Sequence, residues 1–223
     1  MAKWVHRFGR GAPASKADAE ILGGKGASLA AMTRLGLPVP PGFTISAEVC
    51  AQAQSGRFPP GLEREVKAAL AWLERQRSAR FGGKRRPLLV SVRSGAPVSM
   101  PGMMDTVLNL GLNDVSVVAL ARATRDPLFA WDCYRRFVEG YGTVVLGVPA
   151  ESFGTTPGGE ATPHSLESLV HLHQKTILRV TGRAFPQAPV VQLWGAIRAV
   201  FGSWQSARAR AYLEQRDYVL TED

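Results

Sequence analysis

The sequence predicts an α+β fold in which a mixed first part is followed by a second part built from helices. Up to about residue 112, short apolar strands alternate with helices, and from Asn113 onward helical periodicity dominates. With 223 residues, 45% of them hydrophobic, the chain can build one large core or two small ones. We therefore expect an α+β part at residues 1–112 and an all-helical part from Asn113 onward.

In the first part, glycine, proline and capping residues set the limits of the expected elements. Gly23 and Gly24 lead into a helix that Gly36 and the prolines after it stop. Ser46 is a suitable N-cap for the helix that follows a short strand. The expected elements are helices at 25–35, 47–54 and 62–80 and strands at 42–45, 88–92 and 106–110.

In the second part, turn signals separate the expected helices. Pro127 suits the first turn of one helix, and Ser165 is expected to cap a later one. The expected elements are helices at 115–123, 127–141, 166–180 and 190–204, with a surface loop at 150–163. An apolar stripe from Val190 to Trp204 follows helical spacing, which indicates core packing and not a cofactor site.

The charge balance favours anionic partners without choosing among them. The chain carries 27 basic and 18 acidic side chains, a formal net charge of +9. One dense basic patch consists of Arg75, Arg77, Arg80, Lys84, Arg85 and Arg86. Because no nucleic-acid-binding motif accompanies this patch, we interpret it as a solvated basic face and expect no nucleic-acid partner.

The cysteines and the hydropathy pattern indicate where the protein acts. Cys50 and Cys133 are far apart in apolar or helical surroundings, which is typical of buried free thiols in a reducing compartment. The N-terminus has no apolar segment of signal-peptide length, and no window approaches a membrane span. We expect a cytoplasmic protein with no membrane partner.

The strongest functional signal is the arginine at the end of the strand expected at 88–92. Arg93 enters a loop of small residues that begins with Ser94 and Gly95, and a second apolar run starts at Thr106. A guanidinium can bind two phosphate oxygens at once, and small residues let backbone N–H groups approach the same phosphate. This segment therefore indicates a phosphate-binding loop.

A second candidate site lies at the mouth of the first expected helix. Gly23, Gly24, Lys25 and Gly26 form a glycine-rich turn where free N–H groups and the positive end of the helix dipole favour an anion. Lys25 would add a point charge for a phosphate oxygen. The segment lacks the spacing of a P-loop, so an ordinary glycine-rich helix entry is the alternative.

Other candidate residues carry weaker signals. His171 and His173 are spaced i, i+2 and lie on different faces of a helix, so we expect no metal site there and expect His173 to be a core residue. Asp105 is suited to bind a metal or a ribose hydroxyl, or simply to cap the next turn. The glutamates of the second part form no convincing carboxylate pair, so we assign no catalytic residue.

Several long segments resemble the pyruvate, phosphate dikinase family. They are the loop around Arg93 (87–111), the run LGGKGASLAAMTRLGLPVPPGFTI at 22–45, the preceding KWVHRFG at 3–9, VVLGVP at 144–149, Phe185-Pro186 and Gln192-Leu193-Trp194. They occur in the family's order and cover nearly the whole chain. This agreement makes the resemblance specific.

The resemblance implies the first lobe of an ATP-grasp nucleotide-binding domain with a helical insertion, and Mg²⁺ on the ATP. On this basis we expect an α+β nucleotide-binding lobe formed by residues 1–112 together with 205–223, and an all-helical insert subdomain at 113–204. In the family, ATP phosphorylates a histidine on a separate domain, releasing AMP and yielding pyrophosphate with inorganic phosphate, and a third domain passes the phosphoryl group to pyruvate to make phosphoenolpyruvate. By position, Lys25 resembles the family's ATP-phosphate lysine and Arg93 its phosphate-clamping arginine. The loop 99–106 would close over the nucleotide, with Met103 and Met104 at the adenosine side or, alternatively, filling the core.

The same resemblance predicts a chain that does not complete the dikinase reaction alone. No segment matches the family's second ATP-grasp lobe, its phosphohistidine motif or its pyruvate-binding barrel. We therefore weigh a phosphotransferase part against a non-catalytic nucleotide-binding or assembly module and against an inactive remnant. The expected partners are ATP or AMP, together with either a polypeptide that carries the missing domains or a second copy of the chain.

Overall fold

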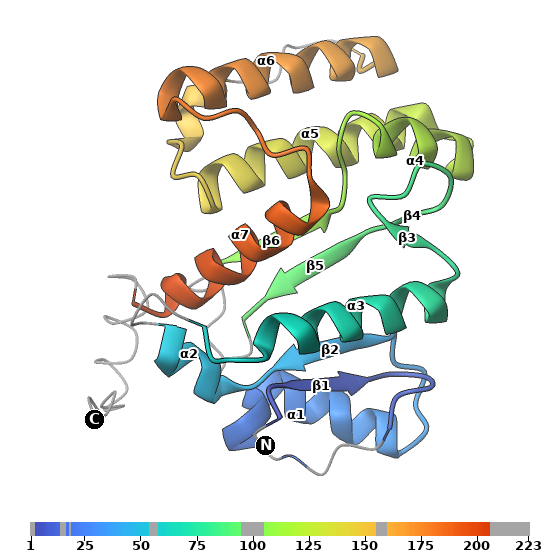
Figure 1. Ribbon diagram of the computed structural model, residues 1–223. Coiled ribbons are helices and arrows are strands. Elements are labelled where there is room, and N and C mark those ends of the chain that lie inside the picture. Colours follow the sequence, from blue (N-terminus) through green and yellow to red (C-terminus); the bar gives the residue numbers. More distant parts are fainter. Residues whose placement is uncertain are drawn as a thin grey trace. The chain divides into compact units, whose positions relative to one another are not determined.

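The computed structural model of the chain describes residues 3–13, 17, 19–53, 58–94, 105–154 and 160–205 (Figure 1). The chain divides into two compact units. Unit 1 is Met1–Arg77, Ser94–Met104 and Phe201–Asp223, and unit 2 is Ser78–Arg93 and Asp105–Val200. Residues 78–93 and 105–112 are thus grouped with the helices of unit 2. The predicted division into a nucleotide-binding lobe (1–112 with 205–223) and a helical insert (113–204) separates functional parts of the chain and not compact units. This division stays a prediction.

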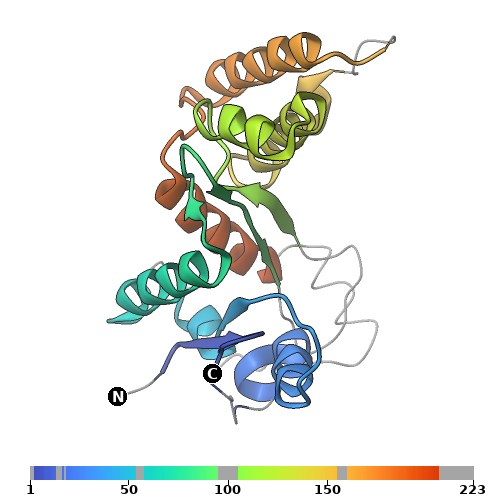
Figure 2. The same ribbon diagram turned by 90° about the vertical axis from the view of Figure 1, so that its right-hand side faces the viewer.

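Unit 1 is built around a two-stranded antiparallel sheet. Strand β1 (Val5–Phe8) pairs with β2 (Gly42–Ile45). The sheet lies between α1 (Ala19–Arg34) and α3 (Leu62–Arg77), as both ribbon views show (Figures 1 and 2). Helix α2 (Ala47–Ala53) follows β2. The expected strand at 42–45 is confirmed, whereas the strand at Val5–Phe8 was not predicted from the sequence.

Helix α3 buries one face because its apolar residues recur at helical spacing. Its buried side chains are Leu62, Val66, Ala69, Trp72 and Leu73. Glu65 of the same helix accepts hydrogen bonds from the backbone N–H groups of Trp4 and Val5, both at 3.0 Å, and so ties the start of β1 to the helix. The predicted end at residue 80 was wrong, because the chain leaves the helix after Arg77.

Unit 2 contains two further strand pairs. Strand β3 (Arg80–Phe81) runs parallel to β4 (Pro87–Leu88), and β5 (Val90–Arg93) is antiparallel to β6 (Thr106–Leu110). The expected strand at 106–110 is confirmed. The strand expected at 88–92 is instead divided between β4 and β5, because the chain changes its pairing partner at Leu89.

The helices of unit 2 follow the strands in the chain. They are α4 (Ser116–Thr124), α5 (Pro127–Val144), the short 3-10 helix η1 (Ala150–Phe153), α6 (Pro163–Thr181) and α7 (Pro189–Gly202); the 3-10 turn η2 (Ser203–Gln205) belongs to unit 1. Helix α5 packs against α4, α6 and β6. The cap of α6 is Thr162, not Ser165: the two residues bond reciprocally in a capping box.

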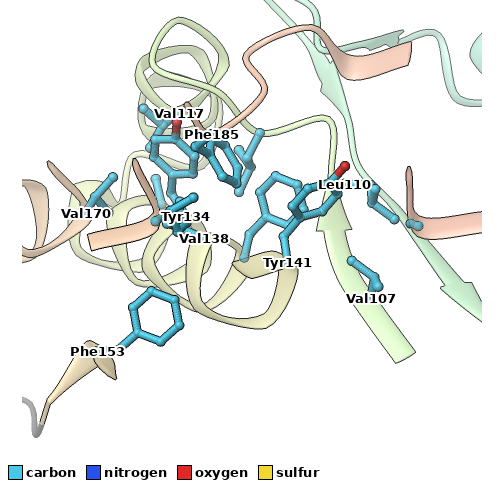
Figure 3. Packing of buried hydrophobic residues seen from close by; sticks show 14 of the residues in the cluster. Val107, Leu110, Val117, Tyr134, Val138, Tyr141, Phe153, Val170 and Phe185 are labelled. Atoms are coloured by element: carbon cyan, nitrogen blue, oxygen red, sulfur yellow. The ribbon is translucent and has the colours of Figure 1, made fainter. Parts of the chain in front are cut away.

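The core of unit 2 is centred on aromatic rings of α5 (Figure 3). Phe185 makes edge contacts with Tyr134, Phe137 and Tyr141, at centroid separations of 6.2, 5.5 and 5.6 Å. Edge-to-face geometry adds roughly 0.5–1.5 kcal/mol per pair to the burial of the rings. Val107 and Leu110 of β6 belong to the same cluster, so the β5–β6 sheet rests on this core.

The burial of several single residues agrees with the sequence predictions, and that of Val190 does not. His173 is 2% exposed, as expected of a core histidine, and Cys50 and Cys133 are free thiols, of which Cys50 is buried and Cys133 half-buried. The stripe of α7 is buried at Leu193, Ile197 and Val200, whereas Val190 is 57% exposed. No helix in the part of the chain that the structure describes is long and apolar enough to cross a membrane.

Candidate functional site

The glycine-rich segment forms a break inside α1. Gly23 has φ 68° and ψ 166°, a backbone conformation that is essentially restricted to glycine. The helix is interrupted there and restarts at Gly24 and Lys25. N–H groups in the first turn of a helix lack partners within the helix and lie at its positive end. The predicted helix start at residue 25 was wrong, because α1 already begins at Ala19, but the glycine turn before Lys25 is confirmed as the break inside the helix. The break places Lys25 where an anion is favoured.

Lys25 is hydrogen-bonded to the residue that follows Arg93 in the chain. Its exposed side chain donates from Nζ to the backbone carbonyl of Ser94 at 3.3 Å. Ser94 itself is 4% exposed, and its Oγ has no hydrogen-bond partner among the described residues. A buried hydroxyl without a partner loses the hydrogen bonds that it makes in water, which a ligand oxygen would restore. Unit 1 thus brings Lys25 and Ser94 together. A nucleotide site at these two residues stays a prediction.

Arg93 lies at the end of β5, directly across from Thr106 of β6. Cross-strand partners share a face of the sheet, and both of these side chains are exposed. The opposite face carries Val92 and Val107, which pack on the core of unit 2. Arg93 forms no ion pair with any described carboxylate. The predicted arginine therefore stands on the open face of the sheet beside a hydroxyl.

The remaining predicted residues have different surroundings. Gly26 is buried where α1 approaches β2, and a Cβ there would lie 2.9 Å from Cγ2 of Thr44 and 3.0 Å from Cβ of Leu22. Close packing is thus a sufficient reason for this glycine. Asp105 is half-buried and precedes Thr106. Gly95, Met103 and Met104 lie outside the described residues.

The candidate residues form two groups, one in each unit. Gly23, Gly24, Lys25, Gly26 and Ser94 belong to unit 1, whereas Arg93, Asp105 and Thr106 belong to unit 2. The peptide bond between Arg93 and Ser94 joins the groups in the chain. A single nucleotide site made from both groups stays a prediction.

Burial has made the thiols poor nucleophiles. It raises the pKa of Cys50 to about 11 and also raises the pKa of Cys133. Among the described residues, no three His, Cys, Asp or Glu side chains are grouped so that they could hold a metal ion.

Sequence reasoning missed two polar residues that hold β6 in place. Gln192 of α7 is fully buried; its Oε1 accepts from the N–H of Gly111 at 3.1 Å, and its Nε2 donates to the carbonyl of Leu112 at 2.8 Å. Asn109 has φ 59°, and its side chain donates to the carbonyl of Cys133 in α5 at 3.2 Å. An asparagine inside an apolar strand, where this residue is uncommon, was the available signal.

The chain is similar to known proteins over nearly its whole length. Residues 19–55 and 51–222 match the family described as "Pyruvate phosphate dikinase, AMP/ATP-binding domain". The chain is 49% identical to pyruvate, phosphate dikinase of Rhizobium meliloti (strain 1021), 46% to that of Giardia intestinalis and 42% to that of Clostridium symbiosum.

These alignments include almost all of this chain and part of each relative. They cover 95%, 93% and 97% of the chain but only 25%, 25% and 26% of the Rhizobium, Giardia and Clostridium proteins. The chain thus spans about a quarter of the length of the curated relatives it matches. The matched segments include Lys25, Arg93 and Thr106. The chain belongs to the pyruvate phosphate dikinase AMP/ATP-binding domain family.

Proposed function

We propose that this chain binds ATP through its phosphates, as the nucleotide-binding part of a pyruvate, phosphate dikinase-like phosphotransferase. The complete reaction would convert ATP, pyruvate and phosphate into AMP, phosphoenolpyruvate and pyrophosphate. The observation that carries the proposal is the hydrogen bond from Lys25 to Ser94, at the restart of α1 and one residue after Arg93. Family membership supports the binding of AMP or ATP.

The two cations would divide the work on the triphosphate. Lys25 has three N–H donors, of which one is used on Ser94, so donors are left for a phosphate oxygen. Arg93 presents a planar fork that can bind two oxygens of one phosphate. Together they would neutralise phosphate charge and hold the chain of phosphates for in-line transfer. No described residue is assigned the transfer itself.

A magnesium ion would accompany ATP in this proposal. Mg²⁺ prefers oxygen ligands and commonly uses only one or two carboxylates, with phosphates and water completing its shell. Asp105 fits this role as a single carboxylate beside Thr106, and a ribose hydroxyl is the other ligand that it could accept. The ion would supply further neutralisation of the phosphates.

The proposal extends to architecture and partners. The α+β lobe would be the first lobe of an ATP-grasp domain, with residues 113–204 as its helical insert. The phosphohistidine and pyruvate steps would be carried out by other parts of the enzyme, supplied by a partner polypeptide. A second copy of the chain is the other partner, which would assemble with it without supplying those steps. We expect the 223 residues alone to release no AMP from ATP, phosphate and pyruvate, and chromatography of the nucleotides would measure this.

Calorimetric titration with Mg-ATP tests the binding proposal. We expect weak binding by the wild-type chain, and a loss of roughly tenfold or more in affinity for Lys25→Ala and for Arg93→Ala. The matched controls are Lys67→Ala and Arg85→Ala, which remove the same charges from exposed positions. Tripolyphosphate should compete with ATP, and adenosine should compete poorly.

The possible results separate the candidate functions. Binding that depends on Lys25 and Arg93, together with catalysis once the other parts are added, supports a phosphotransferase part. The same binding without catalysis in any complementation assay would favour a nucleotide-binding module. No heat at millimolar ATP, or equal losses in the control variants, would contradict the proposal.

A further inference from the structure

The β5–β6 pair contains an irregularity that determines which residue faces Arg93. Val90 pairs with Leu110 and Val92 pairs with Val107, so two steps along β5 match three steps along β6. Leu108 and Asn109 together stand opposite Ser91, which defines a β-bulge. The bulge adds one residue to β6 between the core and the end that carries Thr106.

Asn109 has the conformation that this bulge needs. Its φ of 59° lies in the left-handed region, which asparagine tolerates far better than β-branched residues do. Its side chain donates to the carbonyl of Cys133 in α5, on the same side as the buried Leu110. Consecutive residues of a regular strand would point to opposite faces. The hydrogen bond thus holds the extra residue in place.

The far end of β6 is anchored and cannot adjust. Gln192 binds the backbone of Gly111 and Leu112, and Ser116 donates to the carbonyl of Gly111 at 2.8 Å. Leu110 is fully buried. If the bulge were lost, the change would therefore fall on the end at Thr106 and Val107.

The consequence for Arg93 follows by counting residues. In a regular ladder that keeps Val90 opposite Leu110, Arg93 would face Val107 instead of Thr106. Val107, now 1% exposed, would turn to the open face, and Thr106 would turn to the core. The bulge therefore keeps a hydroxyl beside the arginine and an apolar residue in the core.

We propose that Asn109 is a positioning residue for Arg93: its left-handed conformation sets the register that places Thr106 opposite the arginine, and its hydrogen bond to Cys133 adds stability to that register. The inference rests on the proposed phosphate-binding role of Arg93, which it deepens. In this proposal Asn109 does not contact the nucleotide. Asn109 affects nucleotide binding through the pairing of β5 with β6.

Two measurements on the same variants separate the register from binding. Nuclear Overhauser effects between backbone protons report whether residue 93 pairs with 106 or with 107, and calorimetry with Mg-ATP reports affinity. For Asn109→Val we expect the 93–106 contact to be replaced by 93–107, with affinity weakened roughly tenfold or more, as for loss of a charge-assisted hydrogen bond. Asn109→Gly, which accepts the left-handed conformation, should keep the 93–106 contact and affinity within about twofold of the wild type.

A deletion variant tests the proposed register of β5 and β6 even if Asn109→Val does not fold. Removing Leu108 together with Asn109→Val leaves a strand of the correct length with no bulge, and a β-branched residue suits such a strand. We expect this double variant to fold and to restore the 93–106 contact. Asn109→Val with an unchanged 93–106 contact, or a deletion that fails to restore it, would overturn the proposal. A wild type that binds no ATP would refute the proposed function, while the backbone contacts would still decide the role of Asn109.

Discussion

Arg93 and Thr106 stand directly opposite each other in the antiparallel β5–β6 ladder, with both side chains exposed. The pairing places a guanidinium and a hydroxyl on one face while Val92 and Val107 fill the other. Position 106 can therefore be altered on the open face with little effect on the core. This separation allows the role of the hydroxyl to be tested directly.

If the hydroxyl of Thr106 contributes to nucleotide binding, its removal should weaken ATP binding without unfolding unit 2. We expect Thr106→Val to lower Mg-ATP affinity by about fivefold to tenfold, corresponding to a hydrogen bond of roughly 1 kcal/mol. Thr106→Ser, which keeps the hydroxyl, should bind like the wild type. Calorimetry gives the affinities and thermal unfolding gives the stability. Equal affinity of all three proteins would exclude a contact from this hydroxyl.

The sequence predicted the elements around the site better than their pairing. The apolar run 106–110 and the glycine turn before Lys25 are local signals, and both are confirmed. The bulge at Asn109 depends on the anchoring of β6 by Gln192, which lies 81 residues from its partner Gly111. Such long-range hydrogen bonds have no local sequence signature.

The wrong boundaries have similar causes. Helical periodicity continued beyond Arg77, but Ser78 adopts a φ of 46° and Arg80 then pairs with Pro87. A parallel pairing across so short a segment is not encoded in either strand alone. At α6, Thr162 and Ser165 are both good capping residues, and the capping box uses both. Val190 fitted the apolar stripe by spacing, yet it lies near the start of α7, where it is exposed.

A second prediction concerns Gly26, which the sequence assigned to the nucleotide site. Because a Cβ at this position would lie 2.9 Å from Cγ2 of Thr44, Gly26→Ala should lower the free energy of unfolding by about 1–3 kcal/mol. Thr44→Ala removes Cγ2 and Oγ1 of the threonine, which the new Cβ would meet, so the double variant should recover part of the lost stability. The same change in an open helical position, Gly140→Ala, should instead stabilise by roughly 0.5–1 kcal/mol.

Denaturant unfolding of the single and double variants measures these effects. If Gly26 is required for close packing, the substitutions at positions 26 and 44 together should destabilise the protein less than the sum of their separate effects. The double variant should then bind ATP with wild-type affinity. If affinity is lost in the double variant although stability is recovered, Gly26 acts in binding and the packing explanation is insufficient.

A third prediction concerns the buried hydroxyl of Tyr134. It donates to Oδ1 of Asp114 at 2.6 Å and accepts from Nε2 of Gln174 at 2.9 Å, so it joins α5, α6 and the segment before α4. Tyr134→Phe removes these bonds and should cost about 1–3 kcal/mol of stability. Tyr141, whose ring is also buried, offers the matched control, because its hydroxyl has no hydrogen bond to a described residue; Tyr141→Phe should change stability by less than about 0.5 kcal/mol.

Chemical denaturation of the two tyrosine variants, followed by circular dichroism, provides the comparison. Equal stabilities would mean that the hydrogen bonds of Tyr134 add nothing beyond the packing of its ring against Phe185. Neither tyrosine belongs to the proposed nucleotide site, so ATP affinity should be unchanged in both variants.

The last prediction is a pH dependence of unit 2 that arises from His173. Burial lowers the pKa of this imidazole, and nearby Arg135 lowers it further, against the opposing effects of Glu139 and of a hydrogen bond with the backbone of Phe153. Oε1 of Glu139 lies 3.7 Å from Nδ1, which has no hydrogen-bond partner among the described residues. The folded protein therefore holds His173 neutral at pH values where the unfolded chain takes up a proton.

The sign of the effect follows from this difference in proton binding. As pH falls below about 6.5, the ordinary pKa of histidine, protons favour the unfolded chain and stability declines, by at most about 1.4 kcal/mol per pH unit for one group. His173→Gln should show a smaller fall in melting temperature between pH 7 and pH 5 than the wild type. His171→Gln, two residues away and exposed, should keep the wild-type slope. All three proteins carry the same carboxylates, so a difference between their slopes arises from the histidine that was replaced. Parallel slopes for His173→Gln and the wild type would mean that the buried imidazole does not control acid stability.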